Sequence, residues 1–163
     1  MKLDDLVRYY EDFPSKSIKF LDIQPLLDDN LKFNYVIKKM GQMVKTPSFW
    51  IGVESRGFLF ASALSMKFGG GLKLIRKKGK LPGDNLISID YSLEYGVDTI
   101  QMEKTNTKSN VVVVDDVFAT GGTLNASEKL CELANYKVTD LLTFVDLGIS
   151  KTKLPKLKSL YVI

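Results

Sequence analysis

Apolar residues follow two different spacings along the chain, and each spacing predicts a type of element. From Leu31 to Lys45 they recur every three or four positions, which predicts a helix with one buried face. Phe49 to Val53 is a short continuous apolar run, which is typical of a buried strand. A second helix is predicted over Phe58 to Phe68, and the glycines from Gly69 onward are expected to end it.

The second half of the chain repeats this order. Four consecutive valines, Val111 to Val114, predict a strand buried on both faces of a parallel sheet. We expect a helix over Thr123 to Ala134 and a strand over Val138 to Val145. Shorter strands are expected over Leu72 to Ile75 and Thr99 to Met102. Strands that alternate with helices predict an α/β fold, with a central, mostly parallel sheet flanked by helices.

Four segments have no clear hydrophobic period. A short helix is expected over Leu3 to Tyr10, and irregular or weakly extended chain over Phe13 to Gln24. Arg76 to Gly96 is predicted to be a long polar loop, and loops of this length are usually lids or binding loops. The tail from Lys151 to Lys158 is expected to be a solvated face with a turn at Pro155.

Composition indicates one soluble globular domain. The chain has 163 residues, of which 45% are hydrophobic and 26% charged. No apolar run is long enough to span a bilayer, and the N-terminal residues do not resemble a signal peptide, so we expect a cytoplasmic protein without a membrane partner. The single cysteine, Cys131, excludes an internal disulfide and fits a reducing compartment. It is predicted to be a buried packing residue rather than a nucleophile.

The absence of histidine narrows the chemistry. It excludes Ser-His and Cys-His triads and every metal site that needs a histidine ligand. Acid–base catalysis would fall to carboxylates, lysines or tyrosines. The net charge of +4 and the pI near 9.0 suit phosphorylated metabolites, whereas nucleic-acid binding is not expected.

The stretch VVVVDDVFATGGT predicts a phosphate site. Glycines allow backbone amides to approach a ligand closely, and the N-terminus of the helix that follows adds free donors and a positive dipole end. Neither a Walker A loop nor a dinucleotide fingerprint is present. The alternative is a glycine-rich turn in which Thr123 caps the helix. The candidate phosphate-binding residues are Ala119, Thr120, Gly121, Gly122 and Thr123.

Two adjacent acids, Asp115 and Asp116, precede this loop. Paired carboxylates that directly follow a buried strand are costly unless they have a partner. A sugar diol donates hydrogen bonds, which carboxylates accept. The acids would also offset positive charge that develops at the anomeric carbon, so a ligand with both a ribose and a phosphate fits better than a phosphate alone. The alternative is that both acids cap a turn or helix.

The same stretch resembles the phosphoribosyl-pyrophosphate (PRPP) signature of type I phosphoribosyltransferases, and the likeness is closest to the adenine phosphoribosyltransferases. Four further stretches carry it, in the expected order: FPSKSIKFLDIQPLL, VESRGFLFASAL, LIRKKGKLPG and DYSLEYGVDTIQM. The resemblance implies one phosphoribosyltransferase domain over residues 1–163. Within it we expect a small N-terminal hood over about 1–30 and a flexible lid over about 76–98.

The resemblance also implies an activity, namely transfer of a 5-phosphoribosyl group from PRPP to adenine, giving AMP and pyrophosphate. It implies a homodimer and magnesium as cofactor, held mainly by PRPP and water rather than directly by the protein. Two alternatives stay open. One is a phosphoribosyltransferase for another purine base, and the other is a PRPP-sensing regulatory protein without turnover.

Residue roles follow from the family pattern. Ser55 and Arg56 are expected to bind pyrophosphate, with a strained peptide bond in that loop and a catalytic role for Arg56. Lys77 and Lys80 are expected to reach pyrophosphate, in part across the dimer interface. The lid would contribute the general acid/base and a hydroxyl for phosphate oxygens, from Glu94 and Tyr95. The plainer alternatives are a surface ion pair for Arg56, a solvated basic loop, and an exposed loop glutamate.

The hood is implied to hold adenine through Lys19, Phe20 and Leu21, largely by backbone groups. This segment departs from the common family pattern. Lys16 and Ser17 stand where a Pro-Gly pair is usual, Lys19 replaces an apolar residue, and Leu21 replaces an arginine. The residues therefore favour PRPP binding more strongly than a strict choice of adenine.

Overall fold

The computed structural model describes residues 1–93 and 96–163. The chain divides into two compact units, residues 1–38 and residues 39–163. Helix α2 (Asn30–Gly41) crosses from the first unit into the second. Whether residues 1–163 work as one domain, with a hood over about 1–30 and a lid over about 76–98, stays a prediction.

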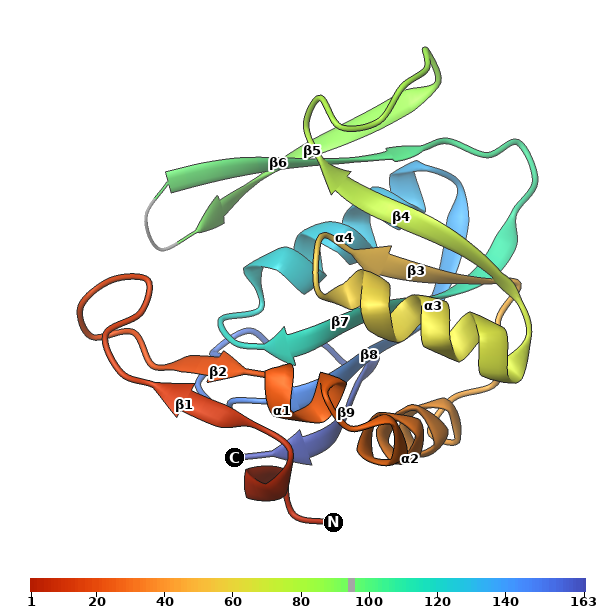
Figure 1. Ribbon diagram of the computed structural model, residues 1–163. Coiled ribbons are helices and arrows are strands. Elements are labelled where there is room, and N and C mark those ends of the chain that lie inside the picture. Colours follow the sequence, from red (N-terminus) through yellow and green to blue (C-terminus); the bar gives the residue numbers. More distant parts are fainter. Residues whose placement is uncertain (94–95) are drawn as a thin grey trace. The chain divides into compact units, whose positions relative to one another are not determined.

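The first unit holds a two-stranded antiparallel ribbon, seen in red and orange in Figure 1. Its elements are the 3-10 helix η1 (Leu3–Asp5), β1 (Arg8–Tyr10), β2 (Phe20–Asp22) and the short helix α1 (Gln24–Leu27). The helix expected over Leu3 to Tyr10 was therefore wrong beyond Asp5. Arg8 lies opposite Asp22 in the ribbon and pairs with its carboxylate at 2.7 Å, which favours extended chain there.

The second unit is built on a seven-stranded sheet with the strand order β5-β6-β4-β3-β7-β8-β9. Five strands, from β4 to β9 in this order, run parallel, whereas β6 is antiparallel to β4 and to β5. The strands are β3 (Phe49–Val53), β4 (Gly71–Lys77), β5 (Leu86–Leu93), β6 (Gly96–Glu103), β7 (Ser109–Phe118), β8 (Tyr136–Asp146) and β9 (Leu157–Val162).

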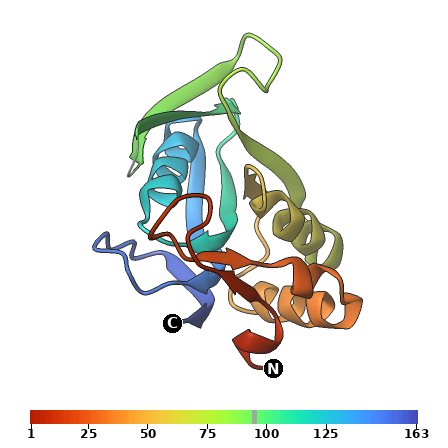
Figure 2. The same cartoon turned by 60° about the vertical axis from the view of Figure 1, so that its left-hand side comes forward.

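The chain leaves the two central strands in opposite directions. From β3 it passes through α3 (Gly57–Phe68) to β4 on one side, and from β7 through α4 (Gly122–Leu133) to β8 on the other. Since both crossovers are right-handed by the general rule, the two helices should cover opposite faces of the sheet. Figure 2 shows this arrangement, with α3 and α4 on either side of the central strands. Such a reversal opens a crevice at the carboxyl ends of the two strands, where ligands of open α/β sheets bind.

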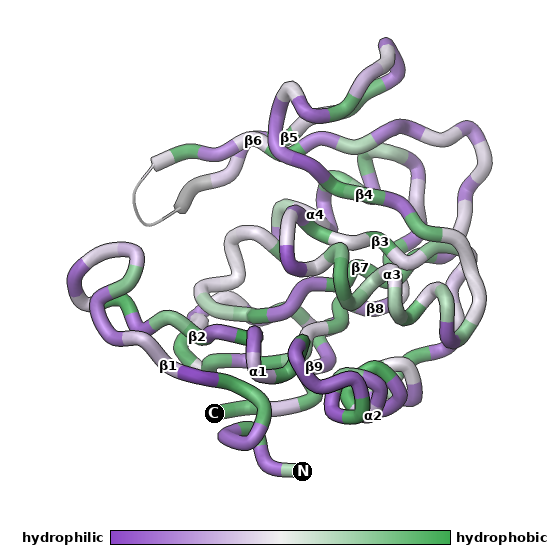
Figure 3. Tube along the Cα trace, viewed as in Figure 1, coloured by the Kyte–Doolittle hydropathy of each residue, from purple (hydrophilic) through white to green (hydrophobic). Residues whose placement is uncertain are grey.

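The core of the second unit is the sheet itself. The four consecutive valines of β7, Val111 to Val114, are fully buried, as expected for a strand covered on both faces. Figure 3 shows the change along this strand, from hydrophobic valines to the hydrophilic acid pair near its end. Cys131 is buried on α4, as predicted, and burial raises the pKa of its thiol. The mostly parallel sheet flanked by helices confirms the predicted fold class.

One prediction of irregular chain was wrong. The polar stretch from Arg76 to Gly96 contains strand β5, which forms a hairpin with β6. Alternating apolar residues explain this strand, for example Ile87, Ile89 and Tyr91, which pack against the core. The turn expected at Pro155 is confirmed, and β9 begins just after it, at Leu157. Within residues 1–93 and 96–163, no helix has the length and apolar character that membrane crossing requires.

Candidate active site

Charged residues lie at the carboxyl ends of three neighbouring strands, β4, β3 and β7. Arg76 and Lys77 end β4, Glu54 and Arg56 follow β3, and the acid pair, Asp115 and Asp116, lies in the last part of β7. Cations and carboxylates therefore alternate along this edge. The acid pair lies inside β7 rather than after it, because the strand continues to Phe118.

Arg56 joins the ends of the two central strands. Its Nε lies 2.8 Å from Oδ2 of Asp116, whose side chain is only 6% exposed. Gly57, the first residue of α3, allows this approach: a Cβ there would lie 2.6 Å from the carbonyl oxygen of Val114 and 3.1 Å from Oδ1 of Asp115. The start of α3 thus packs directly on the backbone of β7. The predicted partners Arg56 and Asp116 are brought together at the crevice.

The environment of the acid pair disfavours the ionised form of both carboxyl groups. Burial raises the pKa of Asp115 well above its usual value, and the neighbouring charge of Asp116 raises it further. Burial also raises the pKa of Asp116, although the Arg56 guanidinium opposes this effect. Oδ1 of Asp115 accepts the backbone N–H of Asp116 at 2.9 Å. Two carboxylates with one cation have remaining acceptor capacity for donors such as a ligand's hydroxyl groups.

The phosphate loop, residues 119–123, follows β7 and opens α4. Gly121 is the N-cap of α4 and has a left-handed backbone, with φ +90°. Thr123 lies one residue inside the helix, so the alternative in which it caps the helix does not hold. Ser150 supports the loop from behind by donating its hydroxyl to the carbonyl of Thr120 at 2.8 Å. The amides of the first turn have no partner within a helix, so the loop offers a ready anion site.

The loop lines a small cavity of about 70 Å³, together with Asp115 and the residues that join it to β7. Asp115 and the phosphate loop therefore line the same cavity. Tyr91 of β5 interacts with Thr123 in the first turn of α4. The pKa of the Tyr91 hydroxyl is raised chiefly by burial. The β5–β6 hairpin thus reaches the phosphate loop.

Lys77 points into this hairpin. Its ammonium lies 3.0 Å from Asp98, which raises the pKa of Lys77 and lowers the pKa of Asp98. Across the hairpin Asp98 lies opposite Tyr91. The structure therefore engages Lys77 with the hairpin, whereas its predicted role in binding PRPP is not tested.

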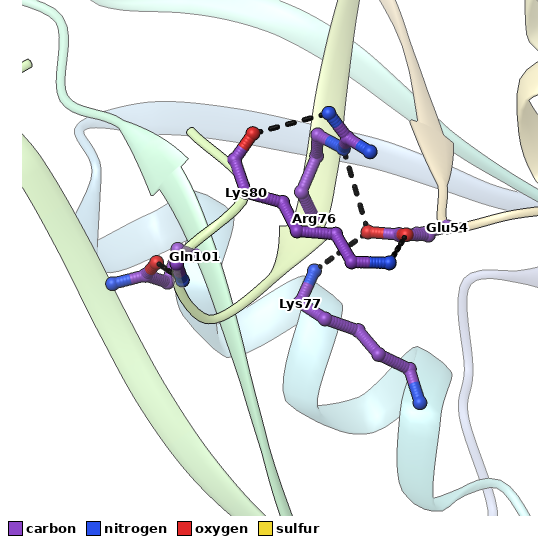
Figure 4. Close-up of polar contacts among 6 residues, drawn as sticks. Glu54, Arg76, Lys77, Lys80 and Gln101 are labelled. Atoms are coloured by element: carbon purple, nitrogen blue, oxygen red, sulfur yellow. Dashed lines mark hydrogen bonds and ion pairs between the residues drawn. The ribbon is translucent and has the colours of Figure 1, made fainter. Parts of the chain in front are cut away.

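Sequence reasoning missed Glu54. Its carboxylate is 9% exposed and gathers donors from residues 76–80, the cationic turn, as Figure 4 shows. Oε1 accepts the ammonium of Lys80 at 2.8 Å, and Oε2 accepts the backbone N–H of Lys77 at 2.8 Å. Nε of Arg76 lies 3.4 Å from Oε2. An acid after an apolar strand is the only signal in the sequence, and it does not identify the partners.

Comparison with known proteins places this arrangement in a family. The model of the phosphoribosyl transferase domain matches residues 29–159. The adenine phosphoribosyltransferase of Hydrogenovibrio crunogenus is 43% identical over 155 residues, which cover 90% of this chain and 88% of that protein. The chain belongs to the phosphoribosyltransferase family, and within it to the adenine phosphoribosyltransferases.

Solved adenine phosphoribosyltransferases share the fold. The enzyme of Thermoanaerobacter pseudethanolicus matches with a TM-score of 0.85 at 35% identity, covering 97% of this chain and 96% of that one. The Saccharomyces cerevisiae enzyme, solved with adenine and an imino-altritol bisphosphate, matches with a TM-score of 0.82 at 33% identity, covering 89% and 86% of the two chains. This phosphoribosyltransferase therefore has relatives that match it over most of their length.

The phosphoribosyltransferase pattern assigns further residues whose roles stay predictions. Ser55 follows Glu54 through a cis peptide bond, at the predicted position of an unusual backbone. Glu94 and Tyr95 lie outside the described residues. The hood residues belong to the first unit: Phe20 and Leu21 lie in β2, and Lys19 precedes it, with its ammonium 3.4 Å from Glu11.

The charges of the site bear on the predicted magnesium ion. Among the residues that the structure describes, no group of three side chains from His, Cys, Asp or Glu could hold a metal ion. Asp116 is paired with Arg56, and one oxygen of Asp115 accepts a backbone amide. A magnesium ion whose ligands come mainly from substrate and water stays a prediction.

Proposed function

We propose that this phosphoribosyltransferase transfers the 5-phosphoribosyl group of PRPP to adenine, releasing AMP and pyrophosphate. One observation carries the proposal: the acid pair lies between an amide-rich phosphate loop and the loop of Arg56, both at the carboxyl edge of β3 and β7. PRPP has the matching order of groups, with a 5-phosphate, a ribose diol and a pyrophosphate. The yeast relative solved with adenine and a bisphosphate supports the same substrate class.

The proposed binding mode follows from the donors and acceptors. The phosphate loop takes the 5-phosphate through its amides, and Asp115 and Asp116 accept hydrogen bonds from the ribose hydroxyls. Ser55 and Arg56 take the pyrophosphate, with Lys77 and Lys80 as further cations. Lys19, Phe20 and Leu21 hold adenine, largely through backbone groups. Because Asp116 is buried and Asp115 is partly buried, the two diol hydrogens would satisfy acceptor capacity that solvent reaches poorly.

The chemical step breaks the bond between the anomeric carbon and a pyrophosphate oxygen and forms a bond to a purine nitrogen. The bonding pair leaves with pyrophosphate, and the purine nitrogen supplies the new pair. Glu94 accepts the proton that the purine loses, in a chain without histidine. The charge of the acid pair favours the positive charge that develops on the ribose, and Arg56 favours the leaving group. A lid over about 76–98 would exclude water, which could otherwise capture the sugar.

Three further properties belong to the proposal. Magnesium, bound to substrate oxygens and water, would neutralise charge on the departing pyrophosphate. The protein would act as a homodimer, with some cations of the cationic turn serving the partner's site. A cytoplasmic location is supported by the single buried thiol and by the absence of disulfide partners in the sequence.

The test is pyrophosphate release from PRPP and magnesium with each purine base in turn. Release with adenine supports the proposal. Comparable release with guanine, hypoxanthine or xanthine would mean that the enzyme accepts other purine bases as well. PRPP binding without turnover on any base would instead indicate a sensor.

Glu94→Gln tests the proposed acid/base role. We expect turnover to fall about 100-fold, since general acid–base catalysis usually contributes 10²–10⁴-fold, while AMP affinity changes little. Rates are compared under saturating PRPP and adenine. Equal rates for the two proteins would remove Glu94 from the mechanism.

A further inference from the structure

Glu54 occupies an unusual position for a carboxylate. It lies two residues before Arg56 and is almost fully buried at an edge where the proposed ligand is anionic. Burial alone would raise the pKa of Glu54, but its bonds to Lys80 and to the amide of Lys77 outweigh burial and hold the pKa below the usual value. An ionised acid beside a pyrophosphate site would weaken binding unless it served another purpose.

The contacts of Glu54 join it to the cationic turn, residues 76–80. The cationic turn is tied together by a bond from the Lys80 amide to the carbonyl of Lys77 at 3.2 Å, and Gly79 has φ +80°. Gln101 accepts the amide of Gly79 at 2.8 Å, and Arg76 donates to the carbonyl of Lys80 at 3.1 Å. Glu54 supplies the contacts that fasten this turn to the end of β3 (Figure 4).

We propose that Glu54 is a positioning residue, which holds the cationic turn, and Lys80 above all, beside the Arg56 loop so that the two together bind pyrophosphate. The inference rests on the proposed function. It assigns Glu54 no contact with substrate, and it makes the affinity for pyrophosphate depend on an acid that the ligand itself repels.

Two opposing effects decide whether Glu54 strengthens or weakens pyrophosphate binding. Glu54 competes with an anion for the Lys80 ammonium, but it also orders a side chain that otherwise loses much entropy on binding. The ammonium has three hydrogens, and the Lys80 side chain is 51% exposed, so donors remain for a ligand. Glu54 makes two further contacts to the turn, with the backbone N–H of Lys77 and with the buried Nε of Arg76. Positioning therefore outweighs competition.

The test compares pyrophosphate and AMP binding to Glu54→Gln by calorimetry. The glutamine keeps the size of the side chain and its bond from the Lys77 amide, but it loses the charge that holds Lys80 and Arg76. We expect pyrophosphate to bind about tenfold more weakly, equivalent to about 1.4 kcal/mol. AMP should bind within twofold of wild type, since the phosphate loop is untouched. In kinetics, KM for PRPP should rise while KM for adenine stays constant.

Two further variants test whether Glu54 acts through Lys80. Glu103→Gln removes the same charge from an exposed pair with Lys73 in the same sheet and should change neither affinity. Lys80→Met should weaken pyrophosphate binding, and adding Glu54→Gln to it should cost clearly less than the sum of the two single effects. If Glu54→Gln folds poorly, Lys80→Met decides the matter alone, because unchanged pyrophosphate affinity in that variant would overturn the inference.

Each outcome counts for or against the inference. Additive effects, an equal loss of AMP and pyrophosphate affinity, or tighter pyrophosphate binding by Glu54→Gln would overturn it. Wild-type protein that neither binds pyrophosphate nor turns over PRPP would instead overturn the proposed function. The two failures are therefore distinguishable.

Discussion

The phosphate loop and the cationic turn present positive charge in different ways. The phosphate loop, residues 119–123, has no charged side chain and relies on the amides at the start of α4. The cationic turn carries four basic side chains within residues 76–80, and Glu54 holds two of them together with a backbone amide. Amides need no counter-charge because the helix already orients them. In the cationic turn, by contrast, a carboxylate contacts the flexible basic side chains.

The largest expected effect comes from Asp116→Asn, which should change AMP binding and pyrophosphate binding differently. AMP should bind about 100-fold more weakly, because hydrogen bonds to charged groups are worth about 1.5–3 kcal/mol and the diol loses its charged acceptor. Pyrophosphate should bind no more weakly, since Arg56 loses the carboxylate that lies 2.8 Å away. Titration calorimetry with each ligand checks both signs.

Circular dichroism serves as the folding control for this variant. Unchanged AMP affinity would count against the assignment of the acid pair to the ribose. A parallel loss of pyrophosphate affinity would mean that Asp116 supports both ends of the site.

A smaller effect is expected from Gly121→Ala, which acts on the phosphate loop alone. Alanine at φ +90° costs about 1–2 kcal/mol, and its Cβ would lie 3.0 Å from the Phe118 ring. AMP affinity should fall about five- to tenfold, while pyrophosphate affinity stays constant. Gly83→Ala is the matched control, since Gly83 has φ +108° and nothing within 4 Å of an added Cβ. A weakening of pyrophosphate binding would show that the two anion sites are not independent.

The smallest effect concerns stability at the acid pair. Burial and Asp116 raise the pKa of Asp115, so the folded protein binds this proton more tightly than the unfolded chain does. Ionised Asp115 therefore destabilises the fold at neutral pH, and this loss disappears as the pH falls through the raised pKa. Asp115→Asn should raise Tm by a few degrees at about pH 7 and leave it nearly unchanged at about pH 4, where ordinary carboxyls titrate. A lower Tm at neutral pH would contradict this sign.

The contrast between the two anion sites also explains which parts of the site were predictable. The phosphate loop follows four valines and precedes a helix, so one continuous stretch of sequence is enough to predict it. Glu54 and Lys80 are far apart in the chain and meet only because β3 and β4 are parallel neighbours. No spacing rule predicts such a pair. The tie between Lys77 and Asp98 depends in the same way on the hairpin.

The fold shows a similar division. The continuous apolar run of β3 and the valines of β7 predicted buried strands, because strands covered on both faces have few polar residues. Strand β5 lies at one edge of the sheet, where polar residues are tolerated and the pattern is weaker. Proline and glycine precede β5 and obscure its alternation. This edge strand was therefore predicted as a loop.

Gly57 has a consequence for the choice of phosphoribosyl donor. Since even an added Cβ at this position would lie 2.6 Å from the carbonyl oxygen of Val114, the start of α3 sits close against the β7 backbone. The distance between the Arg56 loop and the acid pair is therefore set mainly by the main chain. A donor analogue lengthened by one methylene between ribose and pyrophosphate should be rejected even by variants with altered lysines, because accommodating it requires α3 to move as a whole.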